Sequence, residues 1–278
     1  MMSVEPNCFS PLGVFDSGVG GLSVLKAIHQ ELPDESTIYL ADQQHVPYGR
    51  RPLEEVRAYA EAITRYLLEQ GVKLIVVACN TASAAALHGL RITFPDVAFV
   101  GMEPAVKPAA EYTQTGIVGV LATPATFQGV LYASVVERFA SGVTVLQQTC
   151  PGLVTQIEAG QLSGVEPRAI LEKALKPMLE QGIDTVVLGC THYPFVIPLI
   201  EEIVGPVVRV IDPAPAVARQ VRRVLTSRNL LNQPKQTAVH RFLTSGQVSQ
   251  LESSLPVLLG KGAQVKQVCW RGDQLEDC

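Results

Sequence analysis

Short runs of consecutive apolar residues alternate along this chain with longer segments whose apolar residues recur every three or four positions. The continuous runs are typical of strands buried on both faces, as in a parallel sheet. The longer segments have the spacing of helices that bury one side. This alternation predicts an α/β fold with mostly parallel sheets. The expected strands cover residues 12–15, 37–41, 74–78, 97–101, 116–121, 143–146, 185–189, 207–211 and 239–244, and the expected helices cover 22–32, 52–70, 82–87, 167–181 and 216–225.

Glycine and proline mark the segments between these elements. Residues 1–11 are expected to form a loose leader, and residues 42–51 a long loop. Pro177 is expected to bend or split the helix that contains it. The proline-rich segment 212–215 is interpreted as a stiff connector, and a second lobe is expected to begin near Glu103.

One stretch of the sequence occurs twice. Gln70–Thr81 and Gln181–His192 each contain a glycine, an apolar run, a cysteine and a polar turn, and they align without a gap. The constant offset of 111 positions pairs Cys79 with Cys190. Two copies indicate an internal duplication, and therefore two related α/β lobes rather than a solenoid.

The two cysteines follow the carboxyl ends of expected strands, which is where α/β proteins bind ligands. After Cys79 an expected helix begins, and the dipole at a helix N-terminus favours a thiolate. The alternative interpretation is that Cys79 and Cys190 are small buried apolar residues, which is common for unpaired cysteines.

The composition narrows the class of protein. The chain has 278 residues, of which 47% are hydrophobic and 17% charged, as in soluble globular proteins of two domains. A net charge of −4 without a long basic run argues against nucleic acid as the main partner. Neither a membrane-spanning run nor a secretory pattern is evident, and six cysteines in a chain this long do not resemble a disulfide framework. We therefore expect no membrane partner and a cytoplasmic location.

Two thiols facing each other suit one chemical task. Inverting an amino acid at its α-carbon requires a base on one face and an acid on the other. The ordinary pKa of cysteine, near 8.5, allows it to serve as thiolate or as thiol. One of Cys79 and Cys190 would remove the proton and the other would return one, with the roles reversed for the other enantiomer.

Other polar residues lie where such a reaction needs assistance. Asp16 ends the first strand and could act beside Cys79, or it could simply cap the following helix. His192 could hold or move a proton beside Cys190, or it could be packed or solvated. Glu158 could also assist, or it could be a solvated surface residue. Tyr48 and Gly49 lie on a loop long enough to close over a ligand. Turns that could cradle a carboxylate contain Ser17, Asn80, Thr81, Thr123 and Thr191.

At these residues the chain resembles glutamate racemase, a family within the aspartate/glutamate racemase superfamily. The motifs that carry the resemblance are Val14–Gly21, Val46–Gly49, Ala78–Ala82 and Leu188–Pro194, in the order and spacing of the family. The resemblance covers nearly the whole chain, and motifs such as Asp-Ser-Gly, Cys-Asn-Thr and Cys-Thr-His are hard to meet together by chance.

The resemblance implies conversion of L-glutamate to D-glutamate for bacterial peptidoglycan, in the cytoplasm, without pyridoxal phosphate or a metal. It implies two flavodoxin-like lobes with the active site in the cleft between them. Residues 1–102 with 213–278 would form the first lobe, and residues 103–212 the second. We also expect a homodimer.

The resemblance assigns roles to individual residues. Cys79 would be the base toward D-glutamate and Cys190 the base toward L-glutamate, with Asp16 and His192 assisting them. Glutamate contacts are implied at Asp16, Ser17, Tyr48, Gly49, Asn80, Thr81, Thr191 and His192.

Rival interpretations remain open. A dinucleotide site after the first strand lacks the third glycine of its fingerprint, where Ser23 stands, and would set Asp16 against a pyrophosphate. A metal site formed by Cys79, Cys190 and His192 fits zinc spacing poorly. A two-lobed binding protein without activity would not need two thiols. A racemase of aspartate or a related acid is the closest chemical alternative.

Overall fold

The computed structural model describes residues 7–232 and 237–278. The leader expected over residues 1–11 therefore lies partly outside the described residues. The strands are β1 (Leu12–Asp16), β2 (Thr37–Ala41), β3 (Leu74–Val77), β4 (Phe99–Gly101), β5 (Ile117–Ala122), β6 (Thr144–Gln148), β7 (Thr185–Gly189), β8 (Arg209–Ile211), β9 (His240–Thr244), β10 (Val265–Arg271) and β11 (Gln274–Asp277).

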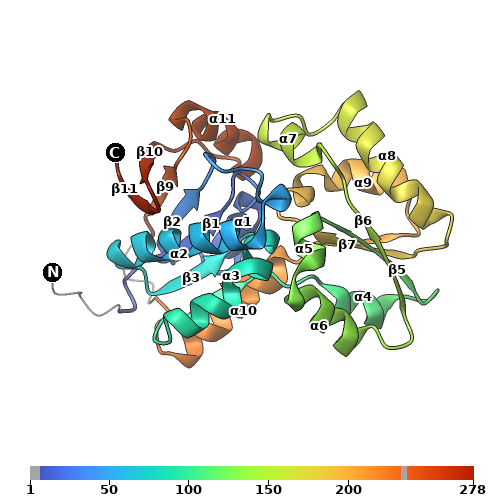
Figure 1. Ribbon diagram of the computed structural model, residues 1–278, viewed down its shortest axis with the longest axis horizontal. Helices are drawn as coiled ribbons and strands as arrows, with labels where there is room; N and C mark the ends of the chain where they lie inside the picture. The colour runs from blue at the N-terminus through green and yellow to red at the C-terminus, as the bar shows by residue number, and fades with distance from the viewer. Residues whose placement is uncertain (1–6, 233–236) are drawn as a thin grey trace.

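Helices follow most of these strands (Figure 1). They are α1 (Leu22–Glu31), α2 (Leu53–Glu69), α3 (Asn80–Thr93), α4 (Val106–Tyr112), α5 (Pro124–Gln128), α6 (Val130–Phe139), α7 (Leu153–Glu158), α8 (Val165–Leu179), α9 (Ile197–Val204), α10 (Ala214–Ser227) and α11 (Val248–Leu259), with short 3₁₀ turns η1 (Tyr48–Arg50) and η2 (Tyr193–Val196).

The larger sheet has the strand order β11-β10-β9-β2-β1-β3-β4. Its pairs are parallel except for β10 with β11, which form an antiparallel hairpin. Alternate residues of its central strands point to opposite faces, as the pleat requires. One face packs against α1, α10 and α11, and the other against α2 and α3. Helices cover both faces of these strands, which is why their sequences are apolar without alternation.

The smaller sheet has the order β6-β5-β7-β8, and all its pairs are parallel. Helices α4 and α6 cover one face, and α8 and α9 cover the other. Two separate sheets, one mostly parallel and one entirely parallel, give the two-lobed α/β fold expected from the sequence. In Figure 1 they lie side by side, with α5 and α7 near the junction.

The C-terminal segment returns to the larger sheet, since β9 pairs with β2 and β10 with β9. This is the connectivity that the division into residues 1–102 with 213–278 and residues 103–212 requires. The exact boundaries, and the internal duplication, remain predictions.

Several local expectations were wrong. The second half of the proposed connector at 212–215 belongs to α10, which begins at Ala214 after the N-cap Pro213, because proline is tolerated in the first turn of a helix. Pro177 does not split its helix, because α8 continues past it to Leu179, and the bend expected there remains a prediction. The sequence pattern also missed α11 and the hairpin β10–β11. In that hairpin Cys269 and Cys278 form a disulfide, which the sequence pattern did not indicate, although a single bridge is not a disulfide framework.

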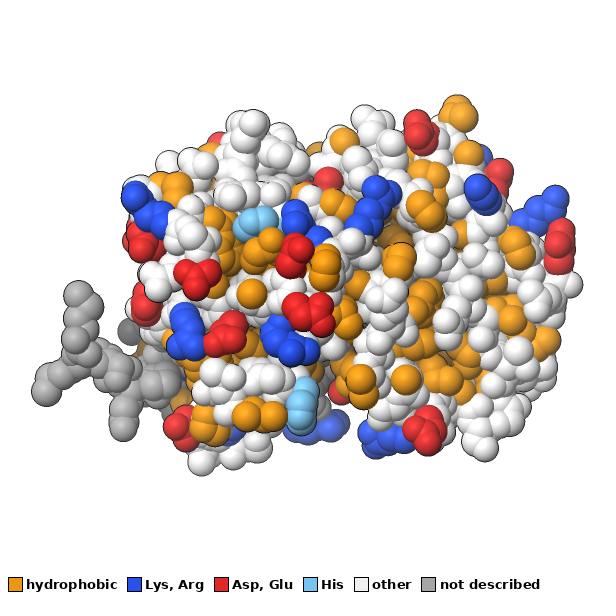
Figure 2. Space-filling view, viewed as in Figure 1, with side chains coloured by type: hydrophobic (Ala, Val, Ile, Leu, Met, Phe, Trp, Pro, Cys, Tyr) orange, Lys and Arg blue, Asp and Glu red, His pale blue; other side chains and the backbone are white. Residues whose placement is uncertain are grey.

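No helix among the described residues combines the length and apolarity needed to cross a bilayer. Acidic and basic side chains are interspersed on the face seen in Figure 2, where no large patch of one sign gathers. This distribution agrees with the small net charge of the chain.

Candidate active site

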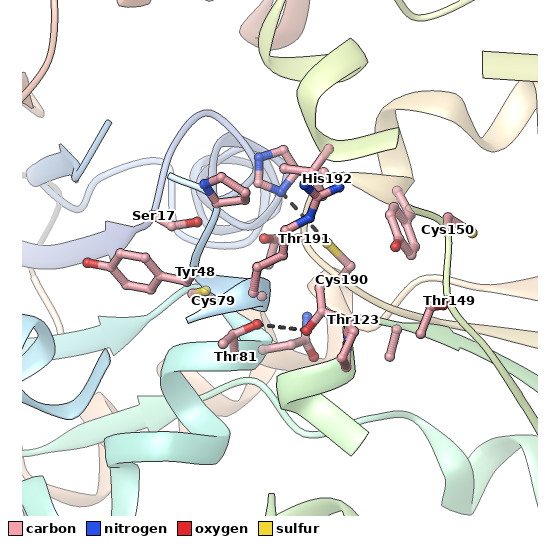
Figure 3. A pocket seen from close by; sticks show the side chains of 18 of the residues that line it. Ser17, Tyr48, Cys79, Thr81, Thr123, Thr149, Cys150, Cys190, Thr191 and His192 are labelled. Atoms are coloured by element: carbon pink, nitrogen blue, oxygen red, sulfur yellow. Dashed lines mark hydrogen bonds between the residues drawn. The ribbon is translucent and has the colours of Figure 1, made fainter. Parts of the chain in front are cut away.

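A cavity of about 270 Å³ opens between the carboxyl ends of the two sheets. Cys79 reaches it from the end of β3, and Cys190 from the end of β7 (Figure 3). Parallel strands bring their carboxyl ends to one edge of a sheet, so the two sheets present the two thiols to the same space. The other expected site residues that line the cavity are Ser17, Tyr48, Gly49, Asn80, Thr81, Thr123, Thr191 and His192.

Cys79 is the N-cap residue of α3. Its sulfur accepts a hydrogen bond from the backbone N–H of Ala82 at 3.5 Å. Burial raises the pKa of the Cys79 thiol well above its ordinary value, and the negative charge of Asp16 raises it further. These effects outweigh the helix N-terminus, so the free protein favours the thiol form of Cys79.

Asp16 lies beneath the cavity rather than in its wall. The side chain is completely buried, and its Oδ2 accepts hydrogen bonds from the backbone N–H groups of Gly18 and Gly21 at 3.2 and 2.9 Å. The Thr191 hydroxyl donates to Oδ1 at 3.4 Å. Burial raises the pKa of Asp16, while the charge of His192 opposes that shift. Asp16 therefore stabilises the turn before α1 through these hydrogen bonds, and it also lies beside the Cys79 thiol.

His192 connects Cys190 to a buried carboxylate. Its Nδ1 lies 3.7 Å from the sulfur of Cys190, and its Nε2 lies 2.6 Å from Oε1 of Glu158. Burial alone would lower the pKa of His192, but the hydrogen bonds and charges of Cys190 and Glu158 outweigh it and raise that pKa well above 6.5. The arrangement favours an imidazolium next to Cys190.

Of the two interpretations of Glu158 that the sequence left open, the structure excludes the solvated surface residue, because the side chain is buried. It is 7% exposed, accepts a hydrogen bond from the backbone N–H of Val19 at 2.7 Å and another from Gln43 at 3.2 Å. Burial would raise its pKa, but the bonds from His192 and these donors lower it overall. The charged form of Glu158 is therefore held in place on the far side of His192.

Two glycines of the turn after β1 make room for this pair. A Cβ atom at Gly18 would collide with the carboxylate of Glu158, and one at Gly20 would collide with the ring of His192. The Ser23 hydroxyl donates to the carbonyl of Thr191 at 2.9 Å at the same junction. The turn is rich in glycine because the second lobe packs directly against it.

The polar wall of the cavity comes from both lobes. The hydroxyl oxygens of Thr81 and Thr123 lie 2.9 Å apart (Figure 3). The hydroxyl oxygen of Thr126 lies 2.9 Å from that of Thr123. Asn80 is buried, yet neither its amide oxygen nor its amide nitrogen has a hydrogen-bond partner in the described structure. A buried amide without partners is costly, so this position is suited to a polar ligand.

Tyr48 contributes its ring rather than a free hydroxyl. It is almost completely buried, and its hydroxyl donates to Asp42 at 2.6 Å. Burial, and then Asp42, raise the pKa of Tyr48 well above 10. Gly49 lies so close to Thr123 that an added Cβ would come within 2.7 Å of the threonine side chain. The loop thus already lies against the second lobe.

Two neighbours of the site were missed in the sequence. Cys150 lines the cavity just after β6, and burial raises its pKa to about 12. Its place after a strand end is the same signal that identified Cys79. Asp42 also follows a strand end, but only the folded chain shows which groups form hydrogen bonds with it.

Within residues 7–232 and 237–278, His, Cys, Asp and Glu side chains form no cluster of three or more suited to a metal ion.

Comparison with known proteins decides the family. Residues 12–221 match the family model described as Asp/Glu/Hydantoin racemase. The chain belongs to this family. A glutamate racemase of Pseudomonas paraeruginosa is 54% identical over 256 residues, which cover 92% of this chain and 96% of that protein.

Solved structures of the racemase family have the same fold. A glutamate racemase isoform from Bacillus anthracis superposes with a TM-score of 0.86 at 33% identity, over 95% of this chain and 98% of that one. The glutamate racemase of Francisella tularensis, crystallised in complex with D-glutamate, gives a TM-score of 0.83 at 30% identity, over 94% and 98% of the two chains. The family membership thus extends over nearly the whole length of this racemase.

Proposed function

We propose that this racemase interconverts L- and D-glutamate by moving the α-proton between two thiols, without a cofactor. The observation that carries the proposal is the placement of Cys79 and Cys190 at the ends of strands from the two sheets, facing one cavity. The names of the relatives support glutamate as substrate.

For L-glutamate, the Cys190 thiolate removes the α-proton and the C–H electron pair remains on the α-carbon. The Cys79 thiol then donates its proton to the opposite face of that carbon. The product is D-glutamate, with Cys190 as the thiol and Cys79 as the thiolate. The reverse sequence converts D-glutamate to L-glutamate.

The surroundings of the two thiols suit the protonation states with which the conversion of L-glutamate begins. His192, as an imidazolium paired with Glu158, stabilises a negative charge on Cys190. Asp16, beside Cys79, disfavours a thiolate there and so holds the proton that the reaction donates. Asp16 and His192 therefore assist the two thiols in different ways, one on each face of the substrate.

The polar wall binds the two carboxylates and the amino group of glutamate. Asn80 has a free amide, and the first turn of α3 offers backbone N–H groups to an anion. All the residues that we assign to substrate binding except Asp16 line the cavity, and the set is Asp16, Ser17, Tyr48, Gly49, Asn80, Thr81, Thr123, Thr191 and His192. We further propose that the protein works in the cytoplasm as a homodimer and supplies D-glutamate for peptidoglycan.

The proposal is tested by circular dichroism of each glutamate enantiomer with dialysed, chelator-treated protein. We expect the signal of either enantiomer to decay to zero without added pyridoxal phosphate or metal, and aspartate to react far more slowly. Faster reaction of aspartate would make it the substrate. Activity that returns only when a metal or pyridoxal phosphate is added would contradict the cofactor-independent mechanism.

A further inference from the structure

Asp42 lies outside the cavity and is the meeting point of three distant segments. Its side chain is completely buried at the end of β2. Oδ2 accepts hydrogen bonds from Tyr48 at 2.6 Å and from the ring of His45 at 2.9 Å, both on the loop that borders the cavity. Oδ1 accepts hydrogen bonds from Ser245 at 2.6 Å and from the indole N–H of Trp270 at 2.7 Å.

Trp270 brings the C-terminal hairpin to this carboxylate. It lies on β10, 228 positions along the chain from Asp42. Its ring packs in a T-shaped arrangement with His45, with centroids 5.0 Å apart, and with Tyr59, with centroids 5.5 Å apart. His45 in turn stacks on Tyr59 at 4.0 Å. The indole is thus fixed by its N–H and by two aromatic neighbours.

The loop held by Asp42 forms one side of the active site. Pro47, Tyr48, Gly49 and Arg50 line the same cavity as Cys79. A ring as buried as that of Tyr48 can be placed only if its hydroxyl has a partner, and that partner is Asp42. Whatever orients the Asp42 carboxylate therefore orients the wall of the cavity.

We propose that Trp270 is a positioning residue for the reaction. Its indole N–H orients Asp42, Asp42 holds Tyr48, and the loop carrying Tyr48 is ordered for glutamate before it binds. The hairpin β10–β11 thereby contributes to the active site without touching it. This inference rests on the proposed function, because it concerns the binding of the same substrate.

The test compares two conservative variants. Trp270→Phe keeps an aromatic ring but removes the donor to Asp42. Tyr66→Phe is the matched control: it removes the hydrogen bond from Tyr66 to Asp277, which anchors the same hairpin at 2.6 Å through β11 but does not reach Asp42. Both proteins are assayed with L- and D-glutamate, and their unfolding in urea is recorded.

We expect Trp270→Phe to raise KM about threefold to tenfold for both enantiomers while kcat stays within about twofold, because the thiols and their partners are untouched. Tyr66→Phe should leave KM unchanged even where it lowers stability. Equal changes of KM in the two variants, no change in Trp270→Phe, or a loss confined to kcat would each overturn the proposal. An inactive wild-type protein would instead overturn the proposed function.

A double-mutant cycle supplies a second test that does not depend on one variant. Tyr48→Phe removes the link between Asp42 and the cavity, so Trp270→Phe should raise KM less in that background than in the wild type. Fully additive effects would contradict a route through Asp42. Trp270 is also the only tryptophan of the chain, so its fluorescence should change on glutamate binding, and that change should be lost in Tyr48→Phe.

Discussion

Oε1 of Glu158 lies 2.6 Å from Nε2 of His192, although the two residues are 34 positions apart. The pair is buried, and the other nitrogen of the same ring faces the sulfur of Cys190. A carboxylate, an imidazole and a thiol are therefore in line, in an order that keeps positive charge next to the thiol.

Glu158→Gln should remove the negative charge that stabilises the His192 imidazolium, while it keeps a side chain of nearly the same shape. The raised pKa of His192 means that its charged form is complete at pH values below about 6.5 and is lost as the pH rises through the folded-state pKa. Removing the carboxylate lowers that pKa, so the alkaline limb of the pH profile of kcat/KM should move to lower pH. We expect kcat to fall about tenfold to hundredfold.

The rates measured in the two directions of racemisation serve as an internal check on Glu158→Gln. Because L- and D-glutamate are equally stable, kcat/KM must fall equally for both. Gln43→Ala, which removes a hydrogen bond to Glu158 but keeps its charge, should leave the position of the limb unchanged. If the alkaline limb of the pH profile of kcat/KM does not shift in Glu158→Gln, Glu158 does not act through His192.

Replacing either cysteine with serine should distinguish the roles of the two bases. Serine is a far weaker acid than cysteine, so Cys79→Ser or Cys190→Ser should lower racemisation about a thousandfold in both directions. A glutamate analogue with a β-leaving group requires only a base, since elimination follows removal of the α-proton.

Elimination should therefore depend on the enantiomer. Cys79→Ser should still eliminate from the L-analogue through Cys190, and Cys190→Ser from the D-analogue through Cys79. Release of the leaving group measures each rate. Equal loss on both enantiomers in both variants would favour one catalytic thiol and a structural role for the other.

Gly20→Ala tests the contact between the lobes. The added methyl group would occupy the space of the His192 ring, which must move away from Cys190. We expect kcat to fall about tenfold or more, since misplaced catalytic groups lose much of their effect. Gly89→Ala is the control, because nothing lies within 4 Å of that position on α3. It should stabilise the protein by about 0.5–1 kcal/mol and leave kcat unchanged.

His29 should make the fold sensitive to acid. Burial, together with the charges of His240 and Lys261, lowers the pKa of His29 to about 3. The unfolded chain binds a proton near pH 6.5 that the folded chain does not, so stability is lost as the pH falls from about 6.5 toward 3. Between pH 7.5 and 5 this group accounts for a loss of about 2 kcal/mol.

Urea unfolding at the two pH values measures this loss. His29→Gln should show a smaller decrease in the free energy of unfolding between them than the wild type. His88→Gln removes an exposed histidine and should behave like the wild type. The same decrease in all three proteins would show that His29 is not responsible.

The pattern of apolar residues determined the class of fold, because strands covered by helices on both faces must be apolar at every position. It predicted β2 exactly and most other strands within a few residues. Position relative to strand ends then identified the candidate thiols, since the carboxyl ends of parallel strands face the ligand. The resemblance in the motifs around Cys79 and Cys190 identified the family.

Only the tertiary structure decided which groups support those residues. Glu158 lies on a short helix with no periodic signal, and its burial depends on the turn at Gly18 and Gly20 in the other lobe. Trp270 reaches Asp42 from the far end of the chain, because β9 and β10 extend the first sheet. Local patterns record which faces of an element are apolar. They do not show which distant element packs against a polar group. The pKa of His192 and the position of Tyr48 depend on such contacts between distant elements.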